Sequence, residues 1–275
     1  MSKKIGFIGL GRMGRWMALN LVKAGFEVLV FDIAPEALAA LTGQGARPAA
    51  SVADLAAGSD WVFLSLPGTD AVREVVFGEE GLVKNLLPGR ILVDLGTTDY
   101  LWTVECAQDL GRLGFRFADA PVSGMEPGAR EGRLTIMFGG EEEVLAEVRP
   151  ALAALGRRIV HMGGPGSGQL AKLINQLVFN LNVAALAQVL PLAVKLGLDP
   201  EKITQVINTG TGRSFASEFF LPGILENRFD RGYSLENAYK DMLCAAEISA
   251  RRRIPLPLFH AANSIYQAAL ALGLG

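Results

Sequence analysis

The chain has 275 residues, of which 50% are hydrophobic and 20% charged, and its formal net charge is −2. This composition is typical of a globular protein with one or two domains and excludes a disordered tail. The only basic run, arginines 251–253, is interpreted as the solvated end of a helix, so no nucleic-acid partner is expected.

The first 160 residues alternate short β-rich runs with helical stretches. Strands are predicted at 4–10, 27–32, 60–67, 90–96, 115–122, 134–140 and 158–163. Helices are predicted at 13–24, 35–43, 51–57, 69–76, 99–113 and 141–155. The early strands are nearly continuous apolar runs, as expected where helices cover both faces of a sheet. This β-α-β alternation predicts an α/β fold with a doubly wound, mostly parallel sheet.

The pattern changes after Gly163, where strand signals stop. Helices are predicted at 166–196, 200–208, 234–252 and 257–272. Asp199 followed by Pro200 is a typical helix start, and Ser234 is a candidate N-cap. We predict two domains, 1–163 and 164–275, the second all-helical and joined to the first by the long helix.

The remaining composition bears on location and metal chemistry. Cys106 and Cys244 stand far apart with no CxxC motif, which favours free thiols in a reducing cytosol. Two histidines without a Cys/His pattern predict no metal site. The first strand begins at the N-terminus and leaves no room for a signal peptide. Asparagines at 180 and 182 argue against a membrane span in the apolar stretch 177–194, so we expect a cytoplasmic protein.

A glycine-rich turn, "GFIGLGRMG" at 6–14, follows the first strand and precedes a helix. In the pattern Gly9-x-Gly11-x-x-Gly14, the first glycine permits a tight turn, the second admits a pyrophosphate and the third allows close helix–strand packing. The helix N-terminus supplies free N–H groups. The loop residues predicted to bind the cofactor are Gly9, Leu10, Gly11, Arg12, Met13 and Gly14.

The second strand ends in an acidic residue, Asp32, eighteen residues after Gly14. Its carboxylate can accept hydrogen bonds from ribose hydroxyls and would repel a 2′-phosphate, so NAD is favoured over NADP. Leu66, Pro67 and Thr97 follow the third and fourth strands at the same sheet edge and are predicted to line the cofactor. These features predict that residues 1–163 form an NAD-binding domain of the Rossmann type.

A second glycine-rich opening, "GGPGSGQLAKLINQ" at 163–176, is not a P-loop because Gln169 follows its last glycine. Lys172 and Asn175 are spaced i, i+3 on one helix face. From the helix pattern alone, the lysine either extends to solvent or serves as an acid/base, with partial burial and a positive helix end favouring the neutral amine. The glycines are interpreted as letting substrate and nicotinamide approach the backbone.

Four separated blocks resemble the β-hydroxyacid dehydrogenase family: "GFIGLGRMGRWMALNL", "DAPVSGMEPGAREGRLTIMFGG", "GPGSGQLAKLINQ" and "AYKDM". The resemblance covers essentially the whole chain. It implies that Lys172 is the catalytic lysine and that Asn175 orients the substrate. It further implies that Ser123 and Gly124 bind the substrate carboxylate and that Lys240 lies near the nicotinamide. The implied reaction is hydride transfer between a nicotinamide and a small 3-hydroxy acid or its semialdehyde.

The segment 208–229 is the variable specificity region by this resemblance. Arg213 is a candidate second contact to the carboxylate, and Phe215, Phe219 and Phe220 are candidate pocket walls. The alternative is that the phenylalanines pack between domains and the arginine lies on the surface. Small branched or C3–C4 3-hydroxy acids are favoured, with 3-hydroxyisobutyrate, glycerate, 4-hydroxybutyrate and L-serine-type compounds as candidates.

Other classes of protein share parts of this pattern. A decarboxylating 6-phosphogluconate dehydrogenase is usually much longer, and an imine reductase usually lacks the lysine. Reductases of tartronate or succinic semialdehyde, and a non-catalytic dinucleotide-binding scaffold, stay open. An enzyme is favoured over a non-catalytic scaffold because the sequence contains Lys172, Asn175 and Ser123 together. The long helix 166–196 is more apolar than one face requires, which predicts a homodimer or homotetramer.

Overall fold

The structure is a computed structural model that describes residues 3–229, 232 and 234–274. The chain divides into two compact units, Met1–Lys172 and Leu173–Gly275, and each is described by itself. The strands of the first unit are β1 (Lys4–Ile8), β2 (Glu27–Phe31), β3 (Arg47–Pro48), β4 (Trp61–Leu64), β5 (Ile91–Asp94), β6 (Arg116–Asp119), β7 (Val122–Ser123), β8 (Leu134–Gly139) and β9 (Gly156–Gly163). Its helices are α1 (Gly14–Lys23), α2 (Pro35–Thr42), α3 (Val52–Ala57), α4 (Thr69–Phe77), α5 (Leu82–Asn85), α6 (Tyr100–Arg112), α7 (Met125–Arg130) and α8 (Glu142–Leu155), followed by the start of α9 (Ser167–Lys195).

These strands form one sheet in the order β3-β2-β1-β4-β5-β6-β8-β7, and β9 pairs with β8. The pairs from β3 to β6 are parallel, as is β8–β9, whereas β8 runs antiparallel to β6 and β7. The predicted doubly wound, mostly parallel sheet is confirmed. The chain reverses its direction of growth between β1 and β4, and ligands of such sheets bind beside this point, outside the carboxyl ends of the strands.

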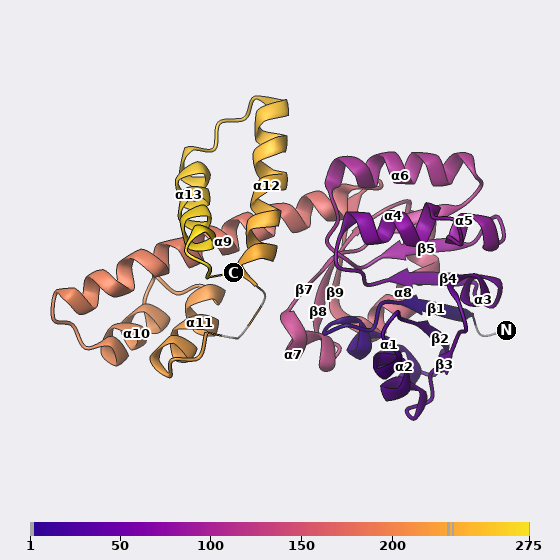
Figure 1. The fold of residues 1–275 in the computed structure, drawn as a ribbon, viewed down its shortest axis with the longest axis horizontal. Helices are drawn as coiled ribbons and strands as arrows, with labels where there is room; N and C mark the ends of the chain where they lie inside the picture. Colours follow the sequence, from indigo (N-terminus) through magenta and orange to yellow (C-terminus); the bar gives the residue numbers. More distant parts are fainter. Residues whose placement is uncertain (1–2, 230–231, 233, 275) are drawn as a thin grey trace. The chain divides into compact units, whose positions relative to one another are not determined.

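Helices cover both faces of the sheet, and the two faces have separate cores (Figure 1). Side chains alternate between them: Phe63 points into the core that contains α1 and α8, while Val62 and Leu64 point into the core with α3 to α6. All three side chains are fully buried. Burial on both faces explains the uninterrupted apolar runs of the early strands.

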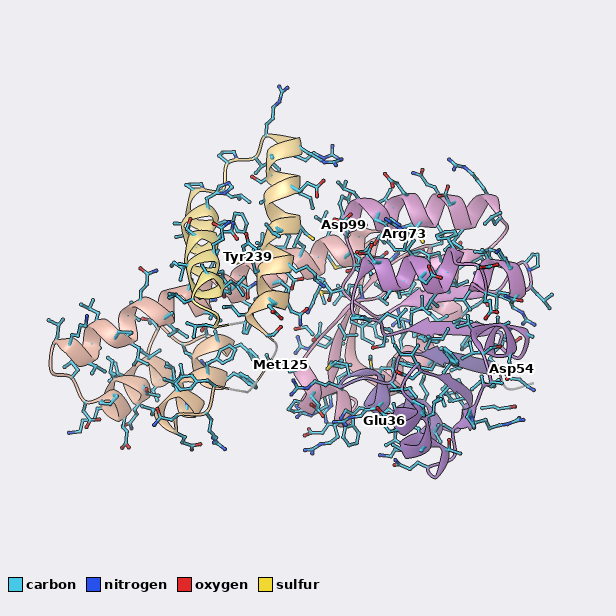
Figure 2. The ribbon with its side chains drawn as sticks, in the orientation of Figure 1. Glu36, Asp54, Arg73, Asp99, Met125 and Tyr239 are labelled. Carbon is cyan, nitrogen blue, oxygen red and sulfur yellow. The ribbon has the colours of Figure 1, made fainter. Side chains whose placement is uncertain are left out.

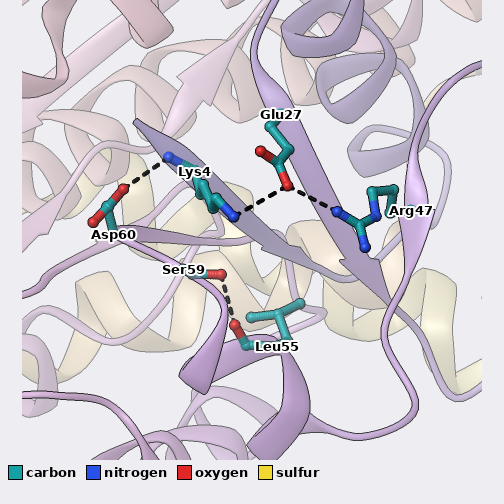
Figure 3. A network of polar contacts seen from close by, with 6 residues as sticks. All are labelled: Lys4, Glu27, Arg47, Leu55, Ser59 and Asp60. Atoms are coloured by element: carbon teal, nitrogen blue, oxygen red, sulfur yellow. Dashed lines mark hydrogen bonds and ion pairs between the residues drawn. The ribbon is translucent and has the colours of Figure 1, made fainter. Parts of the chain in front are cut away.

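Charged residues at the amino ends of the strands hold the sheet edge together (Figure 3). The Lys4 backbone N–H donates to Asp60 at 2.9 Å. Glu27 pairs with the Lys4 ammonium at 3.4 Å and the Arg47 guanidinium at 2.9 Å. These contacts join the starts of β1, β2 and β3 to the residue before β4. Lys4, Glu27, Arg47 and Asp60 at this edge therefore contact one another and connect neighbouring strands.

In the first unit, one predicted strand is divided in the structure, and the short elements β3, α5 and α7 were not predicted. The predicted strand 115–122 is interrupted after Asp119: β6 ends there and β7 pairs antiparallel with β8 at Val122 and Ser123. Proline at 121 has no N–H for a continuous ladder. Helix α7 was not predicted because its sequence, MEPGAR, has no apolar periodicity.

The second unit contains the rest of α9 and the helices α10 (Pro200–Thr209), α11 (Phe215–Leu225), α12 (Leu235–Arg252) and α13 (Pro257–Ala271). Asp199 and Ser234 accept hydrogen bonds from the first turns of α10 and α12, which confirms both as N-caps. Helices α9, α12 and α13 share one apolar core. Gln267 donates to the hydroxyl of Tyr239 at 2.8 Å and so joins α13 to α12; Tyr239 is labelled in Figure 2.

Helix α11 was not predicted, because Pro222 and Gly223 interrupt its apolar pattern. Its phenylalanines form an aromatic cluster, with ring centroids 5.8 Å apart for Phe215 and Phe219 and 5.0 Å apart for Phe219 and Phe220. Phe179 of α9 joins the cluster, 5.9 Å from Phe220. Within this unit the three phenylalanines of α11 contact one another and Phe179, and Phe215 is exposed.

Candidate active site

The first glycine loop joins β1 to α1 through three glycines with different surroundings. Gly9 has a φ of +95°, and a Cβ there would overlap the carbonyl oxygen of Ser65 beside β4. A Cβ on Gly14 would overlap the carbonyl oxygen of Gly9. Gly11 is exposed, and a Cβ there would meet no atom within 4 Å. Two glycines thus close the turn, and the third leaves open space beside the helix N-terminus.

Asp32 holds this loop against the end of β2. Its carboxylate accepts hydrogen bonds from the backbone N–H of Leu10 at 2.6 Å and of Ala34 at 2.9 Å. The side chain is half-buried. A carboxylate has about four lone-pair positions, so acceptor capacity is left for ribose hydroxyls.

The loops after β4 and β5 carry the other predicted cofactor residues at the same sheet edge. Leu66 and Thr97 are half-buried and Pro67 is exposed. The two loops are tied together because the Asp99 backbone N–H donates to the Thr69 hydroxyl at 2.9 Å. Asp99 also accepts from the Trp102 N–H at 2.8 Å and caps α6 (Figure 2).

The loop after β7 contains Ser123, which is half-buried, and Gly124, whose φ is +139°. Met125 follows with a φ of +55°, a left-handed conformation that costs roughly 1–2 kcal/mol for a residue with a side chain. Its place at the start of α7 is labelled in Figure 2. Met125, which follows Gly124 in this loop, therefore has the left-handed backbone conformation that glycine adopts most easily.

Glu126 connects this loop to the first glycine loop. Its carboxylate accepts from the Trp16 indole at 2.9 Å, pairs with Arg15, and lies 3.6 Å from the Nε of Arg12. The Trp16 hydrogen bond and then the arginines hold the pKa of Glu126 below its usual value. The predicted carboxylate loop and the predicted pyrophosphate loop are thus joined through α7 and α1.

Lys172 is placed against the predicted carboxylate loop. Its side chain is buried, with 8% of its surface exposed, and its Nζ donates to the carbonyl oxygen of Val122 at 2.9 Å. Val122 directly precedes Ser123 in β7. The structure therefore excludes the solvent-exposed alternative for this lysine.

Two glycines of the second opening, Gly166 and Gly168, serve close packing within the protein, whereas a Cβ on Gly164 would meet no atom within 4 Å. A Cβ on Gly168 would overlap the carbonyl oxygen of Met137, and one on Gly166, whose φ is +91°, would lie 2.6 Å from Val104. At these two positions the structure differs from the expectation that the glycines make room for substrate and nicotinamide. The reason is that α9 begins directly against the sheet, where β8 and Asp119 occupy the space.

Two buried aspartates were not recognised in the sequence. Asp94 and Asp119 end β5 and β6 as paired residues, and neither is exposed to solvent. Burial raises the pKa of each carboxyl to about 6, although hydrogen bonds oppose the shift. The available signal was that two neighbouring apolar strands each end in an aspartate at the sheet edge where ligands bind.

The other predicted site residues belong to the second unit. Asn175 is exposed there and donates to Gln176 at 3.3 Å. Arg213 is exposed and lies 3.6 Å from Glu218. Lys240 is half-buried on α12, next to Asp241, which accepts from Gln176 at 3.1 Å. The first unit gathers the glycine loop, Asp32, the carboxylate loop and Lys172.

Comparison with known proteins is consistent with this geometry. Residues 4–164 match the model of the NAD-binding domain of 6-phosphogluconate dehydrogenase, and residues 166–275 match the NAD-binding model of NADP-dependent 3-hydroxyisobutyrate dehydrogenase. The chain is 38% identical to 2-(hydroxymethyl)glutarate dehydrogenase of Eubacterium barkeri, covering 100% of this chain and 91% of the relative. It is 36% identical to 2-hydroxy-3-oxopropionate reductase of Escherichia coli (strain K12), covering 98% and 92%.

A solved structure shows the same fold over the full length. The structure of 3-hydroxyisobutyrate dehydrogenase from Salmonella typhimurium superposes with a TM-score of 0.92 at 28% identity, covering 100% of this chain and 96% of that one. Fold and site together define an oxidoreductase that uses a nicotinamide dinucleotide. The chain belongs to the β-hydroxyacid dehydrogenase family, which confirms the resemblance seen in the sequence.

The different surroundings of Gly11 and Gly14 generate a testable prediction. Gly11→Ala adds a methyl group to open space, so the free energy of unfolding of the cofactor-free protein should stay within about 0.5 kcal/mol of the parent value. The Kd for NADH, measured by fluorescence titration, should rise by at least roughly tenfold. Gly14→Ala, in contrast, should destabilise the cofactor-free protein by roughly 1–3 kcal/mol through overpacking.

Thermal unfolding of both variants with and without NADH separates the two effects. Equal loss of stability in the cofactor-free variants would contradict the assignment of open space to Gly11.

Proposed function

We propose that Lys172 is the acid/base of a hydroxyacid dehydrogenase reaction and that Ser123 and Gly124 bind the substrate carboxylate beside it. The observation that carries the proposal is the burial of Lys172 with its Nζ 2.9 Å from the carbonyl oxygen preceding Ser123. A lysine ammonium has three N–H donors, so one group can donate both to a backbone carbonyl and to a substrate oxygen. On α9, Asn175 lies one turn further along and orients the same substrate.

The residues of the first unit fit a dinucleotide. The space beside Gly11 and the start of α1 would hold the pyrophosphate, with Arg12 nearby, and Asp32 would bind the adenosine ribose. Leu66, Pro67 and Thr97 would line the cofactor at the ends of β4 and β5, and Lys240 would approach its nicotinamide end. Residues 1–163 thus form the NAD-binding domain, and 164–275 complete the substrate site and mediate subunit contact. When bound, the cofactor supplies the hydride chemistry.

A side chain of the protein transfers the proton in the proposed reaction. In the direction of oxidation, the Nζ of Lys172 takes the proton of the substrate hydroxyl, and in reduction it returns that proton to the carbonyl oxygen. The carboxylate of the substrate accepts hydrogen bonds from the Ser123 hydroxyl and the backbone N–H groups after it. Arg213 is a further candidate contact to this carboxylate.

The chemistry of the relatives' substrates narrows the substrate class. The names 2-(hydroxymethyl)glutarate, 3-hydroxyisobutyrate and 2-hydroxy-3-oxopropionate share a carboxylate whose α-carbon bears a hydroxymethyl or aldehyde group. We assign this chain to the same class, the small 3-hydroxy acids and their semialdehydes. The substituent on the α-carbon then distinguishes one member from another.

Lys172→Met tests the acid/base assignment. The variant preserves the apolar stem and removes the proton carrier, so kcat should fall by roughly 10²- to 10⁴-fold while the Kd for NADH changes little. The matched control is Lys195→Met at the exposed end of the same helix, which should keep full turnover. Unchanged kcat in Lys172→Met would overturn the assignment.

A substrate panel tests the class and the cofactor. Initial rates with NAD and NADP should be measured on 3-hydroxyisobutyrate, 2-(hydroxymethyl)glutarate, glycerate, L-serine and 4-hydroxybutyrate. We expect turnover on one or more of the first four compounds, and a higher kcat/KM with NAD than with NADP because Asp32 repels a 2′-phosphate. Binding of NADH with no turnover across the panel and the matching semialdehydes would instead support a non-catalytic dinucleotide-binding protein.

The exposed apolar surface of α9 supports a homodimer or homotetramer. The large exposed side chains on this helix include Ile174, Val178, Val189 and Leu192. By length and composition alone α9 could cross a membrane, a test that core helices of globular proteins also pass. Its Asn180 is buried, however, and its carbonyl accepts from the Tyr266 hydroxyl at 3.2 Å inside the helical unit.

Light scattering of the purified chain should give twice or four times the monomer mass of 29.3 kDa. Val178→Glu should lower that mass because an unpaired charge at an apolar interface is costly. A monomeric parent at micromolar concentration would contradict the oligomer.

A further inference from the structure

Asp119 is a buried carboxylate for which the proposed reaction gives no role. It ends β6, is not exposed to solvent and lies three residues before Val122. Among the residues that the structure describes, no basic side chain forms an ion pair with it. A buried carboxylate without a counter-ion needs strong hydrogen bonds to compensate for lost hydration.

Both oxygens of Asp119 accept hydrogen bonds from the beginning of α9. The Gly166 N–H donates to Oδ1 at 2.6 Å, and the Gln169 N–H donates to Oδ2 at 2.7 Å. These N–H groups belong to the first turn, where no partner exists within the helix. The positive end of the helix favours a negative charge there. The Asp119 carboxylate, forty-seven positions before Gly166, thus accepts the hydrogen bonds that an N-cap side chain would otherwise accept at the start of α9.

Gln169 extends the same contact to the neighbouring strand. Its buried side chain donates to the carbonyl oxygen of Gly96 at 2.9 Å and accepts from the Thr98 N–H at 3.2 Å. These two residues flank Thr97 in the loop after β5. The first turn of α9 is therefore fixed to β6 through Asp119 and to the β5 loop through Gln169.

Two glycines make this approach possible. A Cβ on Gly139 of β8 would lie 2.5 Å from Asp119 Oδ1 and 2.6 Å from the Gly168 nitrogen. A Cβ on Gly168 would lie 2.8 Å from Asp119 Oδ2. Neither the strand nor the helix has room for a side chain, so the carboxylate has little freedom to move. Lys172 follows on the next turn of the helix.

We propose that Asp119 is a positioning residue that fixes the first turn of α9 and thereby places the Nζ of Lys172 beside the carboxylate loop at Val122. The chain of contacts runs from the Asp119 carboxylate through the Gly166 and Gln169 N–H groups to the helix that carries Lys172. This inference rests on the proposed acid/base role of Lys172. A displacement of about 1 Å at a reacting group can lower a rate by roughly 100-fold, so tight placement is required.

Asp94 provides a matched control on the neighbouring strand. It is equally buried and pairs with Asp119 in the sheet register. It accepts from the Gly96 N–H and from the Thr98 hydroxyl, both at 2.9 Å. An asparagine at 94 can accept from Gly96 and donate to Thr98, because a hydroxyl can reverse its role. At 119 it cannot, because both partners are backbone donors.

The experiment compares Asp119→Asn with Asp94→Asn. The NADH Kd, the kcat expressed per NADH-binding site, and the KM for a 3-hydroxy acid identified in the substrate panel are measured for each. We expect Asp119→Asn to lower kcat roughly 10- to 100-fold with an NADH Kd within about twofold of the parent, and Asp94→Asn to keep kcat within about threefold. Asp119→Ser provides the same comparison with a smaller side chain if the asparagine variant does not fold.

The outcomes separate this inference from the proposed function. If Lys172→Met loses turnover while folded Asp119→Asn retains it, the positioning role is wrong and the acid/base role stands. If Lys172→Met retains turnover, the acid/base assignment fails first. Equal losses of kcat in the two asparagine variants, or a loss in NADH affinity that matches the loss in kcat, would show a general structural role and overturn the proposal.

Discussion

The hydrogen bonds from Gly166 and Gln169 to Asp119 are the contact on which the proposed placement of Lys172 depends, because they hold the start of α9 against the sheet. Burial raises the pKa of this carboxyl from 3.8 to about 6 even though the two backbone hydrogen bonds lower it. Keeping it ionised at neutral pH therefore costs roughly 3 kcal/mol of folding free energy. Such a cost is typical of functional sites, where stability is given up for geometry.

The charged residues at the two edges of the sheet have different surroundings. At the amino ends, Lys4, Glu27 and Arg47 neutralise one another in exposed contacts that are worth little individually. At the carboxyl ends, Asp119 is buried with no ion pair to any residue that the structure describes, and Asp32 accepts hydrogen bonds from backbone N–H groups. Buried carboxyls with raised pKa values at the edge where parallel sheets bind ligands are typical of functional sites.

Much of this arrangement could be predicted from the sequence because it depends on local patterns. The Gly9 to Gly14 spacing, the apolar strand runs and the Asp199 cap each reflect contacts within a few residues or one strand–helix unit. The burial of Lys172 could not be predicted from its helix, since apolar neighbours suit either a buried or an extended lysine. It depends on β7, which lies fifty positions earlier.

Contacts between residues distant in the sequence also explain why two helices were not predicted. Helices α7 and α11 contain proline and glycine and are stabilised by contacts to other elements, such as Glu126 with Trp16. Asp119 was part of a recognised block, yet its role depends on β6 lying beside β5 and under α9. Periodicity carries no information about such distant pairs.

The two glycine-rich openings look alike in the sequence but use glycine for opposite physical reasons. At Gly11 the missing side chain leaves space that stays open, which suits a ligand. At Gly168 the space is filled by the Met137 carbonyl and the Asp119 carboxylate. A helix seated this tightly has few ways to shift, because close-packed interiors resist small displacements. In the proposed site, the first opening would admit the cofactor, and the second would fix Lys172 beside the substrate.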